Sequence, residues 1–336
     1  MINNLTENEI TKSWSDWKCE APPLVSIRCI AYNQEKYIED TLNGFLMQKT
    51  DFPFEIIVHD DASTDRTAKI IKEYADRFPH IIQPILETEN QYSKGGTHLA
   101  DRVKPYLRGK YIALCEGDDY WIDPSKLQKQ IDFLESHSDF GMCYTEFDIK
   151  DEVNNTYRKR LFHSEPQKYP MTYNLEEWIL KKGYVAPMTW VILKELWDTY
   201  EKLDSCDGTY VMFAHFLANS NVKCLDEYST AVYRIIKESA SHFTNVDKIY
   251  SRVKNLHGIQ HILISKYNLS AAFSDSVDTR YYNRSYKPIC VCGSRQEREE
   301  CYKHIKSLKF RLFYYLTSIG FIRAFIKNVY SSIKNR

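Results

Sequence analysis

Apolar and polar residues alternate in blocks through the first part of the chain. Residues 24–32 (LVSIRCIAY) form an apolar run of strand length. Residues 35–49 place their apolar side chains at helical spacing, with Ile38, Leu42 and Phe45 on one face. The pattern predicts a buried strand followed by a helix that covers it.

The same order recurs further along the chain. Apolar runs of strand length occupy 54–60, 81–86 and 110–116, and helical spacing follows the first and the last of them. The apolar positions of these two helices are Ala68, Ile71, Ala75 and Phe78 in one and Leu127, Ile131 and Leu134 in the other. Strands separated by helices of this length predict an α/β fold with a doubly wound, mainly parallel sheet flanked by helices.

The later part of the chain has a different pattern of apolar and polar residues. Strand and helix patterns return in 189–198, 207–219 and 222–235, and from residue 246 onward the pattern is mainly helical. We therefore predict an N-terminal tail over 1–23, an α/β domain over 24–245 and a helical C-terminal region over 246–336.

Two of the predicted strands end in clusters of acids. The run 54–60 ends at Asp60 and Asp61, and the run 110–116 is followed directly by Asp118 and Asp119. In a doubly wound sheet, ligands bind beyond the carboxyl ends of the strands, where the strand order reverses. We expect these acids to meet there at one crevice, together with the Tyr32-Asn33 pair that follows the first strand.

The acids that follow the fourth strand have the chemistry of a cation site. Carboxylate oxygens are hard ligands that suit Mg²⁺ or Mn²⁺ better than zinc. Such an ion at Asp118 and Asp119 would bridge a diphosphate and neutralise the charge that builds on it as a leaving group. The structural alternative is an Asp-rich loop that precedes the helix opened by Asp123 and Pro124.

Three segments, VSIRCIAYNQEKYI, EIIVHDDASTDRT and RGKYIALCEGDDYWIDPSKL, resemble in this order the family 2 glycosyltransferases of the GT-A fold. The resemblance covers 24–147 strongly and 185–235 weakly. It implies an inverting enzyme with a nucleotide-diphosphate sugar as donor, most often a UDP-sugar, and Mn²⁺ or Mg²⁺ as cofactor. The implied acceptor is a glycan or lipid-linked hydroxyl in the synthesis of a bacterial-type surface polysaccharide.

The resemblance also implies roles for individual residues. The segment along the nucleoside base is matched by Ala31, Tyr32, Asn33 and Glu35. Asp61 matches the acid that accepts a hydrogen bond from uracil, whereas Asp60 is expected to fix the loop or the ribose. Asp118 and Asp119 match the ribose and metal contacts of the DXD motif. Glu116 stands where many relatives carry Asp, so which two of these acids touch the ion stays open.

An inverting transfer needs a base that takes the proton of the acceptor hydroxyl. The resemblance gives this role to Asp207, in DSCDGTYVMFAHF, with Asp204 as the nearest competitor. The alternative for either residue is capping of the following helix. Thr189 and Trp190 match the segment that lines the acceptor, and core packing is the alternative for Trp190.

Arg234 matches a Tyr-Arg pair near the end of the family's fold and is expected to contact the donor. Relatives often carry a His two positions later that approaches the diphosphate or the metal, and here that position is Ile236. Lys237 and His242 are the nearest residues that could replace it.

The nine cysteines are scattered, odd in number and mostly set in apolar runs, as expected of reduced thiols. Cys290, Cys292 and Cys301 lie close in sequence but lack a second Cys pair or a His pair, so we expect no metal there. The N-terminus has no basic start or apolar run of a signal peptide, and no stretch is long and apolar enough to span a bilayer.

Charge is distributed unevenly. The chain carries 45 basic and 45 acidic residues, yet residues 301–336 contain eight Lys or Arg and no acid. The uncharged stretch Leu312–Ile322 is too short to span a bilayer, and its basic flanks favour an interfacial helix on anionic lipid. The alternative is packing on the catalytic domain or on a second subunit. We expect a cytoplasmic protein, peripheral on the inner membrane, with no nucleic-acid partner.

Other functions were weighed against this one. A phosphatase or phosphotransferase would use Asp60 as nucleophile, but that chemistry wants an acid two positions on, where Ala62 stands. A nucleotidyltransferase normally opens with a Gly-rich basic loop, unlike the YNQE segment here. A catalytically inactive glycan-binding scaffold would not need the acids at the crevice, which are costly to bury unpaired.

Overall fold

The structure of this chain is a computed structural model. It describes residues 5–14, 22–94, 99–169, 171, 173–181, 184–203, 205, 207–236, 245–305 and 307–333. Two compact units make up the chain. The sheet unit comprises Met1–Thr172, Tyr184–Glu201 and His215–Lys237, and the helical unit comprises Tyr173–Gly183, Lys202–Ala214 and Glu238–Arg336. Two internal segments of the predicted 24–245 domain, and its last residues from Glu238 on, thus group with the helical unit.

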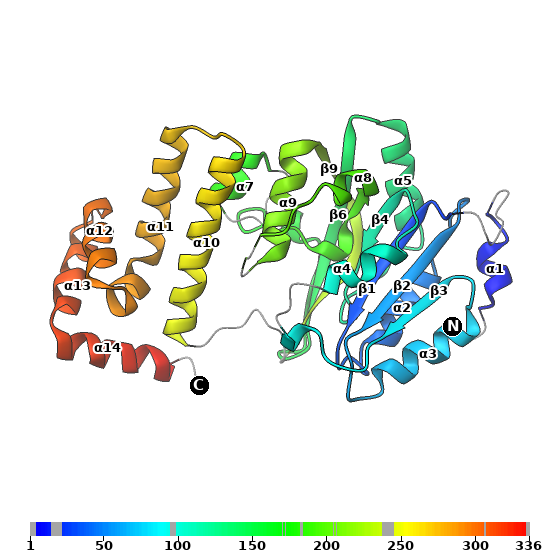
Figure 1. Ribbon diagram of the computed structural model, residues 1–336, viewed down its shortest axis with the longest axis horizontal. Helices are drawn as coiled ribbons and strands as arrows, with labels where there is room; N and C mark the ends of the chain where they lie inside the picture. The colour runs from blue at the N-terminus through cyan, green and yellow to red at the C-terminus, as the bar shows by residue number, and fades with distance from the viewer. Residues whose placement is uncertain are drawn as a thin grey trace. The chain divides into compact units, whose positions relative to one another are not determined.

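The sheet unit is built on one sheet with the strand order β3-β2-β1-β4-β8-β6-β9-β5, and β7 pairs with β6. The strands are β1 (Val25–Ala31), β2 (Phe54–Asp60), β3 (Ile82–Leu86), β4 (Tyr111–Leu114), β5 (Tyr120–Trp121), β6 (Phe140–Asp151), β7 (Thr156–Arg158), β8 (Val191–Leu193) and β9 (Asn221–Ile235). Figure 1 shows β1, β2 and β3 side by side, in blue to cyan.

The first four strands confirm the predicted parallel arrangement. β1 pairs in parallel with β2 and with β4, and β2 pairs in parallel with β3. The short strand β8 then runs antiparallel to both β4 and β6. The parallel, doubly wound order therefore extends from β3 to β4, and the strand order reverses around β1, the first strand of the sheet.

Helices with one apolar face cover this sheet, as the helical spacing predicts. The helices of the sheet unit are α1 (Glu7–Thr11), α2 (Ile38–Leu46), α3 (Thr67–Arg77), α4 (Leu99–Val103), α5 (Lys126–Ser136), α6 (Leu161–Ser164) and α8 (Lys194–Asp198), with 3-10 turns at Tyr92–Lys94, Lys104–Tyr106 and Pro187–Thr189. In α2, Ile38, Leu42 and Phe45 are fully buried. The helix α9 (Gly208–Asn219) has residues in both units.

Part of the predicted N-terminal tail is folded. Thr6 and Glu9 form a capping box that starts α1. Trp14 is buried, its Nε1 donates to Thr50 Oγ1 at 3.0 Å, and its ring meets that of Phe54 edge-on at 5.1 Å. The polar composition of 1–23 concealed this anchor, because Ile10 and Trp14 are isolated apolar residues among polar ones.

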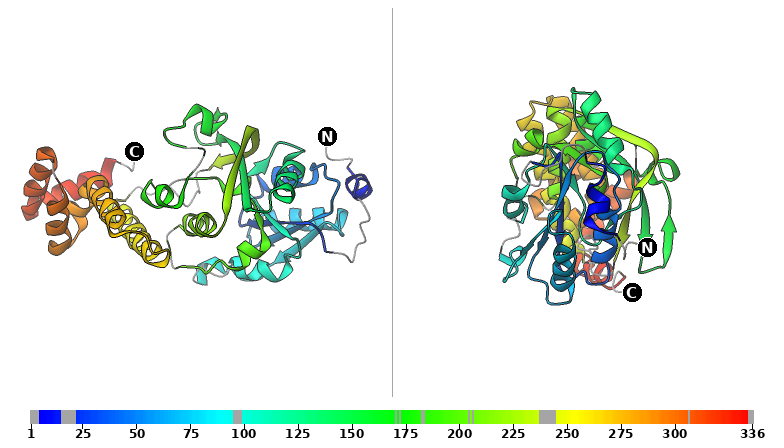
Figure 2. Two further views of the ribbon diagram at one scale, coloured as in Figure 1. Left: turned by 90° about the horizontal axis from the view of Figure 1, so that it is seen from above. Right: turned by 90° about the vertical axis from the view of Figure 1, so that its right-hand side faces the viewer.

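The helical unit consists of α7 (Leu175–Lys181), α10 (Val246–Lys266), α11 (Ala271–Cys292), α12 (Arg295–His304), α13 (Leu308–Ser318) and α14 (Gly320–Ile333). Figure 2 shows α10 to α14 in yellow to red. A small apolar core forms around Tyr286, Ile289, Cys301 and Ile305. The seven cysteines in the described residues are free, and none of them belongs to a metal-binding group there.

The C-terminal tail is folded as two helices, α13 and α14, and its expected place on a membrane surface stays a prediction. The chain leaves helical geometry at Ile319, whose φ of −81° and ψ of 115° are extended, and α14 starts at Gly320. A β-branched residue next to glycine is a weak point for a helix. Within the described part of the chain, no helix has the length and apolarity that crossing a membrane requires.

Candidate functional site

Both acid-bearing loops are attached to the end of β1. The backbone N–H of Asp61 donates to the carbonyl oxygen of Ala31, the last residue of β1, at 3.0 Å. The backbone N–H of Gly117 donates to the carbonyl oxygen of Ile30, one residue earlier, at 2.9 Å. The two loops therefore leave the sheet at the same point on its carboxyl edge, as the strand topology predicts.

Glycine at position 117 lets the second loop lie flat against the first strand. A Cβ atom there would lie 2.3 Å from Gln34 Oε1 and 3.0 Å from the Ala31 Cβ. The Gln34 oxygen is the far end of a flexible side chain and can shift, so the tight contact with the Ala31 Cβ is the one that disfavours a larger residue here. The close approach carries Glu116, Asp118 and Asp119 to the end of β1.

The loop after β1 is joined to the loop after β2 through side-chain hydrogen bonds. Asn33, in the left-handed region with a φ of 52°, accepts from the backbone N–H of Thr64 at 2.8 Å through Oδ1. Glu35 Oε2 accepts from the backbone N–H of Arg66 at 3.0 Å. Asn33 and Glu35, which we expected along the nucleoside base, therefore make hydrogen bonds that hold the two loops together.

The two other members of that set lie differently. Ala31 is buried at the end of β1, whereas the Tyr32 side chain is 46% exposed. Tyr32 is therefore the residue of this set whose ring is open to a ligand.

Asp60 fixes its own loop, which agrees with the role expected for it. Its Oδ2 accepts from the backbone N–H of Ser63 at 3.0 Å and its Oδ1 accepts from the Ser63 hydroxyl at 2.5 Å. The residue is 1% exposed. A carboxylate buried and bonded in this way is a poor nucleophile, which argues against the phosphotransferase alternative.

Asp61 links the loop after β2 to the segment after β3. Its Oδ1 accepts from the backbone N–H of Gln91 at 2.7 Å and its Oδ2 from that of Tyr92 at 3.0 Å. Asn90 adds a bond from its Nδ2 to the Asp61 carbonyl at 3.1 Å. These bonds join the segment after β3 to the loop that carries Asp61.

The acids after β4 raise one another's pKa. Burial and the nearby Glu116 carboxylate raise the pKa of Asp118 to about 6. Burial, followed by the charge of Asp118, raises the pKa of Asp119 well above its usual range. Glu116 is partly neutralised by Arg28, whose Nη2 lies 3.1 Å from its Oε1. The loop therefore gathers negative charge that the protein only partly compensates.

Arg234 braces this loop from β9. It is 2% exposed, its backbone N–H donates to Asp119 Oδ1 at 2.8 Å, and its Nη1 donates to the Asp118 carbonyl at 3.0 Å. The guanidinium also pairs with Asp40 and lies 4.1 Å from the centre of the Tyr120 ring. Its contacts in the structure are thus with the protein, and a contact with the donor stays a prediction.

The residues present fit a divalent cation. Asp118 and Asp119 offer oxygen ligands of the kind that Mg²⁺ and Mn²⁺ prefer. Their raised pKa values show that a positive charge would stabilise the ionised forms. Glu116 is the less suitable ligand of the three, because its carboxylate is paired with Arg28.

Thr189 and Trp190 are both fully buried. The Thr189 hydroxyl donates to the Ala186 carbonyl at 2.7 Å, and the Trp190 ring meets Phe216 at 6.1 Å. These contacts favour the core-packing alternative over the expected contact with an acceptor.

Asp207 belongs to the helical unit and caps α9. Its Oδ1 accepts from the backbone N–H of Tyr210 at 3.1 Å, and its Oδ2 lies 3.4 Å from Arg252 Nη2. The capping alternative is therefore realised, and the role of Asp207 as base stays a prediction. Its competitor Asp204 lies outside the described residues, as do Lys237 and His242.

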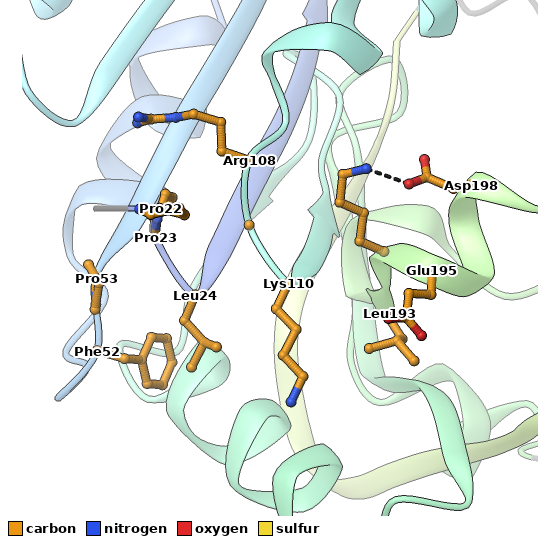
Figure 3. Close-up of a pocket in the computed structure, with 12 residues that line it drawn as sticks. Pro22, Pro23, Leu24, Phe52, Pro53, Arg108, Lys110, Leu193, Glu195 and Asp198 are labelled. Atoms are coloured by element: carbon orange, nitrogen blue, oxygen red, sulfur yellow. Dashed lines mark hydrogen bonds and ion pairs between the residues drawn. The ribbon is translucent and has the colours of Figure 1, made fainter. Parts of the chain in front are cut away.

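A cavity of about 670 Å³ lies at the opposite ends of the strands, where β1 and β4 begin (Figure 3). Its lining includes Leu24 and Lys110, which directly precede β1 and β4. Lys194 and Asp198, which also line it, form an ion pair with each other. Open α/β sheets bind their ligands at the carboxyl ends of the strands, so we place the site at the acids and not here.

Proteins with similar sequences include an uncharacterized protein and two glycosyltransferases. The chain is 50% identical over 121 residues to an uncharacterized protein of Mycobacterium tuberculosis, a match that spans 36% of this chain and 34% of that protein. It is 29% identical over 238 residues to an uncharacterized glycosyltransferase of Methanocaldococcus jannaschii, across 69% of this chain and 75% of the relative. The E. coli β-1,3-glucosyltransferase WfaP is 35% identical over 144 residues, or 43% of this chain and 53% of WfaP.

Solved structures with the same fold confirm the GT-A architecture. The crystal structure of S. aureus TarS 1–349 in complex with UDP-GlcNAc matches with a TM-score of 0.58 at 18% identity, over 93% of this chain and 90% of that one. The mannosyltransferase PcManGT from Pyrobaculum calidifontis, in complex with GDP-Man and Mn²⁺, matches with a TM-score of 0.52 at 15% identity, over 96% and 93% of the two chains.

The family itself is identified by the sequence. Residues 26–200 match the family model described as glycosyl transferase family 2, and this range contains β1, β2, β4 and both acid-bearing loops. Because the match covers more than half of the 336 residues, the chain belongs to glycosyl transferase family 2.

Proposed function

We propose that this protein is a metal-dependent, inverting glycosyltransferase that moves a sugar from a UDP-sugar to a hydroxyl of a glycan or lipid-linked acceptor. The observation that carries the proposal is the attachment of both acid-bearing loops to consecutive carbonyls at the end of β1. The named ligand of TarS is UDP-GlcNAc, and WfaP is named as a UDP-Glc transferase, which supports UDP as the nucleotide.

In this proposal Asp118 and Asp119 hold Mn²⁺ or Mg²⁺ together with the donor diphosphate. A bound ion would neutralise the negative charge that develops on the departing diphosphate. Arg234 keeps the two acids in place through its bonds to the Asp118 carbonyl and to Asp119 Oδ1. Asp119 uses Oδ1 for that bond, so Oδ2 is the oxygen that we assign to the ion.

The nucleoside is assigned to the loops after β1 and β2. The exposed ring of Tyr32 offers a surface for the base. Each oxygen of Asp61 accepts one backbone N–H, and a carboxylate oxygen has a second lone pair that can accept from uracil. Gln91 and Tyr92 thereby hold the Asp61 carboxylate in a fixed orientation.

Asp207 is the proposed general base. Support comes from its place in the sequence, directly before a helix in the second part of the fold, as the family resemblance implies. Its carboxylate accepts from the backbone N–H of Tyr210 and lies 3.4 Å from Arg252 Nη2, and these contacts hold it at the start of α9.

The tail is assigned to an anionic membrane surface, where a lipid-linked acceptor would reside. Its two helices expose large apolar side chains, namely Leu308, Leu312, Tyr315, Leu316, Ile319, Phe321, Phe325 and Val329. Lys309 and Arg311 are exposed beside them on α13. Apolar side chains flanked by basic ones and free of acids suit anionic lipid headgroups. WfaP is named for an acceptor linked to diphosphoundecaprenol, which agrees with this assignment.

The function is tested by measuring UDP release across a panel of UDP-sugars and GDP-sugars with Mn²⁺ or EDTA. We expect release from one UDP-sugar, abolished by EDTA and lowered about 100-fold or more in Asp119→Asn, because a charge on the leaving group loses its stabilisation. Asp132→Asn, which alters an exposed carboxylate on α5, is the matched control. Phosphate release from simple phosphoesters, with no nucleotide release from any donor, would contradict the proposal.

The raised pKa of Asp118 predicts a pH-dependent stability of the metal-free protein. A folded pKa of about 6 lies above the usual 3.8, so the folded state favours the protonated acid. Stability from this group is therefore present below pH 4 and lost as the pH rises through 6. Asp118→Asn should raise the free energy of unfolding at pH 7.5 by roughly 1–3 kcal/mol, and by less at pH 5.

Urea unfolding of both proteins in EDTA at the two pH values measures this difference, with Asp132→Asn as control. Adding Mn²⁺ at pH 7.5 should stabilise the wild type more than Asp118→Asn. If Asp118→Asn changed the free energy of unfolding equally at pH 5 and pH 7.5, the Asp118 carboxyl would not have the raised pKa described.

Flotation with vesicles tests the tail. The full-length protein should float with anionic phospholipid vesicles at low salt and much less with zwitterionic ones. The double variant Phe321→Ser/Phe325→Ser should lose most of this binding, because both side chains are strongly exposed on α14. Ile262→Ser, which removes an exposed apolar side chain from α10, is the control. Equal flotation of the double variant and the wild type would remove the membrane assignment.

A further inference from the structure

Three metal-ligating side chains converge in the helical unit, on residues to which the proposed transfer gives no role. His257 and His261 lie one turn apart on α10, so they share a face of that helix. Asp278, on α11, lies within hydrogen-bonding distance of both histidines. Its Oδ1 lies 2.6 Å from His257 Nε2 and 2.8 Å from His261 Nε2, and the two Nε2 atoms are 3.1 Å apart.

Asp278 Oδ1 and the two histidine Nε2 atoms form a triangle only slightly smaller than the triangle of three ligand atoms around a tetrahedral zinc ion. Zinc binds histidine nitrogen at about 2.0–2.1 Å and carboxylate oxygen at about 2.0–2.2 Å in a tetrahedron, which puts neighbouring ligand atoms roughly 3.3 Å apart. The observed edges of 2.6, 2.8 and 3.1 Å are shorter by a few tenths of an ångström or somewhat more. Small outward shifts of the side chains would therefore admit the ion.

The rings are held in the orientation that this geometry needs. The His257 ring stacks on Tyr281 with centroids 3.8 Å apart and planes 4° from parallel. The Nδ1 atom of His261, on the other side of its ring, lies 3.4 Å from the Ser274 hydroxyl. Contacts of this kind orient metal-binding histidines and fix which nitrogen faces the ion.

The cluster is partly open to solvent. The side chains of His257, His261 and Asp278 are 16%, 38% and 25% exposed. An ion can therefore enter, and a water molecule can fill the fourth position. Among the residues that the structure describes, this is the group of three or more His, Cys, Asp or Glu side chains whose ligand atoms come close enough to share an ion.

We propose that His257, His261 and Asp278 form a zinc site that ties α10 to α11, with water as the fourth ligand. Two imidazole nitrogens and one carboxylate suit Zn²⁺, whereas Mg²⁺ and Mn²⁺ prefer all-oxygen sites. The site therefore differs in metal preference from the acids of the sheet unit. Binding of zinc to the folded form stabilises the helix pair, because the unfolded chain does not hold the three ligands together.

The site is tested on tag-free, metal-stripped full-length protein, with Co²⁺ as the spectroscopic probe and Zn²⁺ as the competitor. We expect one equivalent of Co²⁺ to give the strong visible absorption of tetrahedral coordination, and Zn²⁺, but not excess Mg²⁺, to displace it. His261→Ala and Asp278→Asn should each weaken Zn²⁺ binding by about 100-fold or more, since each removes one of three protein ligands. Zn²⁺ should raise the Tm of the wild type and leave that of His261→Ala unchanged.

Two variants serve as matched controls. His80 forms a two-residue His–carboxylate pair with Glu7, with 2.9 Å between Nδ1 and Oε2, and His80→Ala should leave the Co²⁺ spectrum unchanged. Asp119→Asn, in the acid loop, should also keep the tetrahedral spectrum. Far-UV circular dichroism checks that the variants fold, and Asp278→Asn retains the side-chain shape. Absence of the tetrahedral spectrum in the wild type, or equal Zn²⁺ affinity in the wild type and both ligand variants, would overturn the proposal.

Discussion

The carbonyl groups of Ile30 and Ala31, at the end of β1, hold the two acid-bearing loops at one point. One accepts the N–H of Gly117 and the other the N–H of Asp61, so the loop after β4 and the loop after β2 leave the sheet side by side. This pairing follows from the parallel order of β2, β1 and β4. Neither loop alone carries enough chemistry for the proposed transfer, and in the proposal their attachment to one strand end makes them a single site.

The acids at this point carry an electrostatic cost that the protein leaves partly uncompensated. Arg28 pairs with Glu116, and Arg234 donates from Nη1 to the Asp118 carbonyl and from its backbone N–H to one oxygen of Asp119. The pKa values of Asp118 and Asp119 are nevertheless raised. Strained carboxylates are typical of functional sites, where a ligand of opposite charge relieves the strain. The structure thus provides a rigid oxygen-rich site suited to a cation.

Much of this arrangement could be predicted from the sequence. Helical and strand spacing located β1, β2, β4, α2, α3 and α5. The strand-end acids led to the proposed site, because open parallel sheets bind their ligands at the carboxyl ends of the strands. Contacts set by the tertiary fold could not be predicted. The spacing of residues does not show that Asp61 bonds to Gln91 and Tyr92, or that Arg234 turns to the acid loop. For Trp190 it left both core packing and an acceptor contact open, and the residue is buried. The break at Ile319 was also not predicted, because composition and charge do not show where one helix ends and the next begins.

The most direct test of the central claim is calorimetric titration of UDP with and without Mn²⁺. If the two loops form one site for the nucleotide and the ion, Mn²⁺ should tighten UDP binding to the wild type. Asp119→Asn should lose this enhancement. Asp61→Asn should bind UDP more weakly, but Mn²⁺ should still tighten its UDP binding by the same factor as in the wild type. Equal UDP affinity of the wild type with and without Mn²⁺, or an unchanged enhancement in Asp119→Asn, would contradict the account.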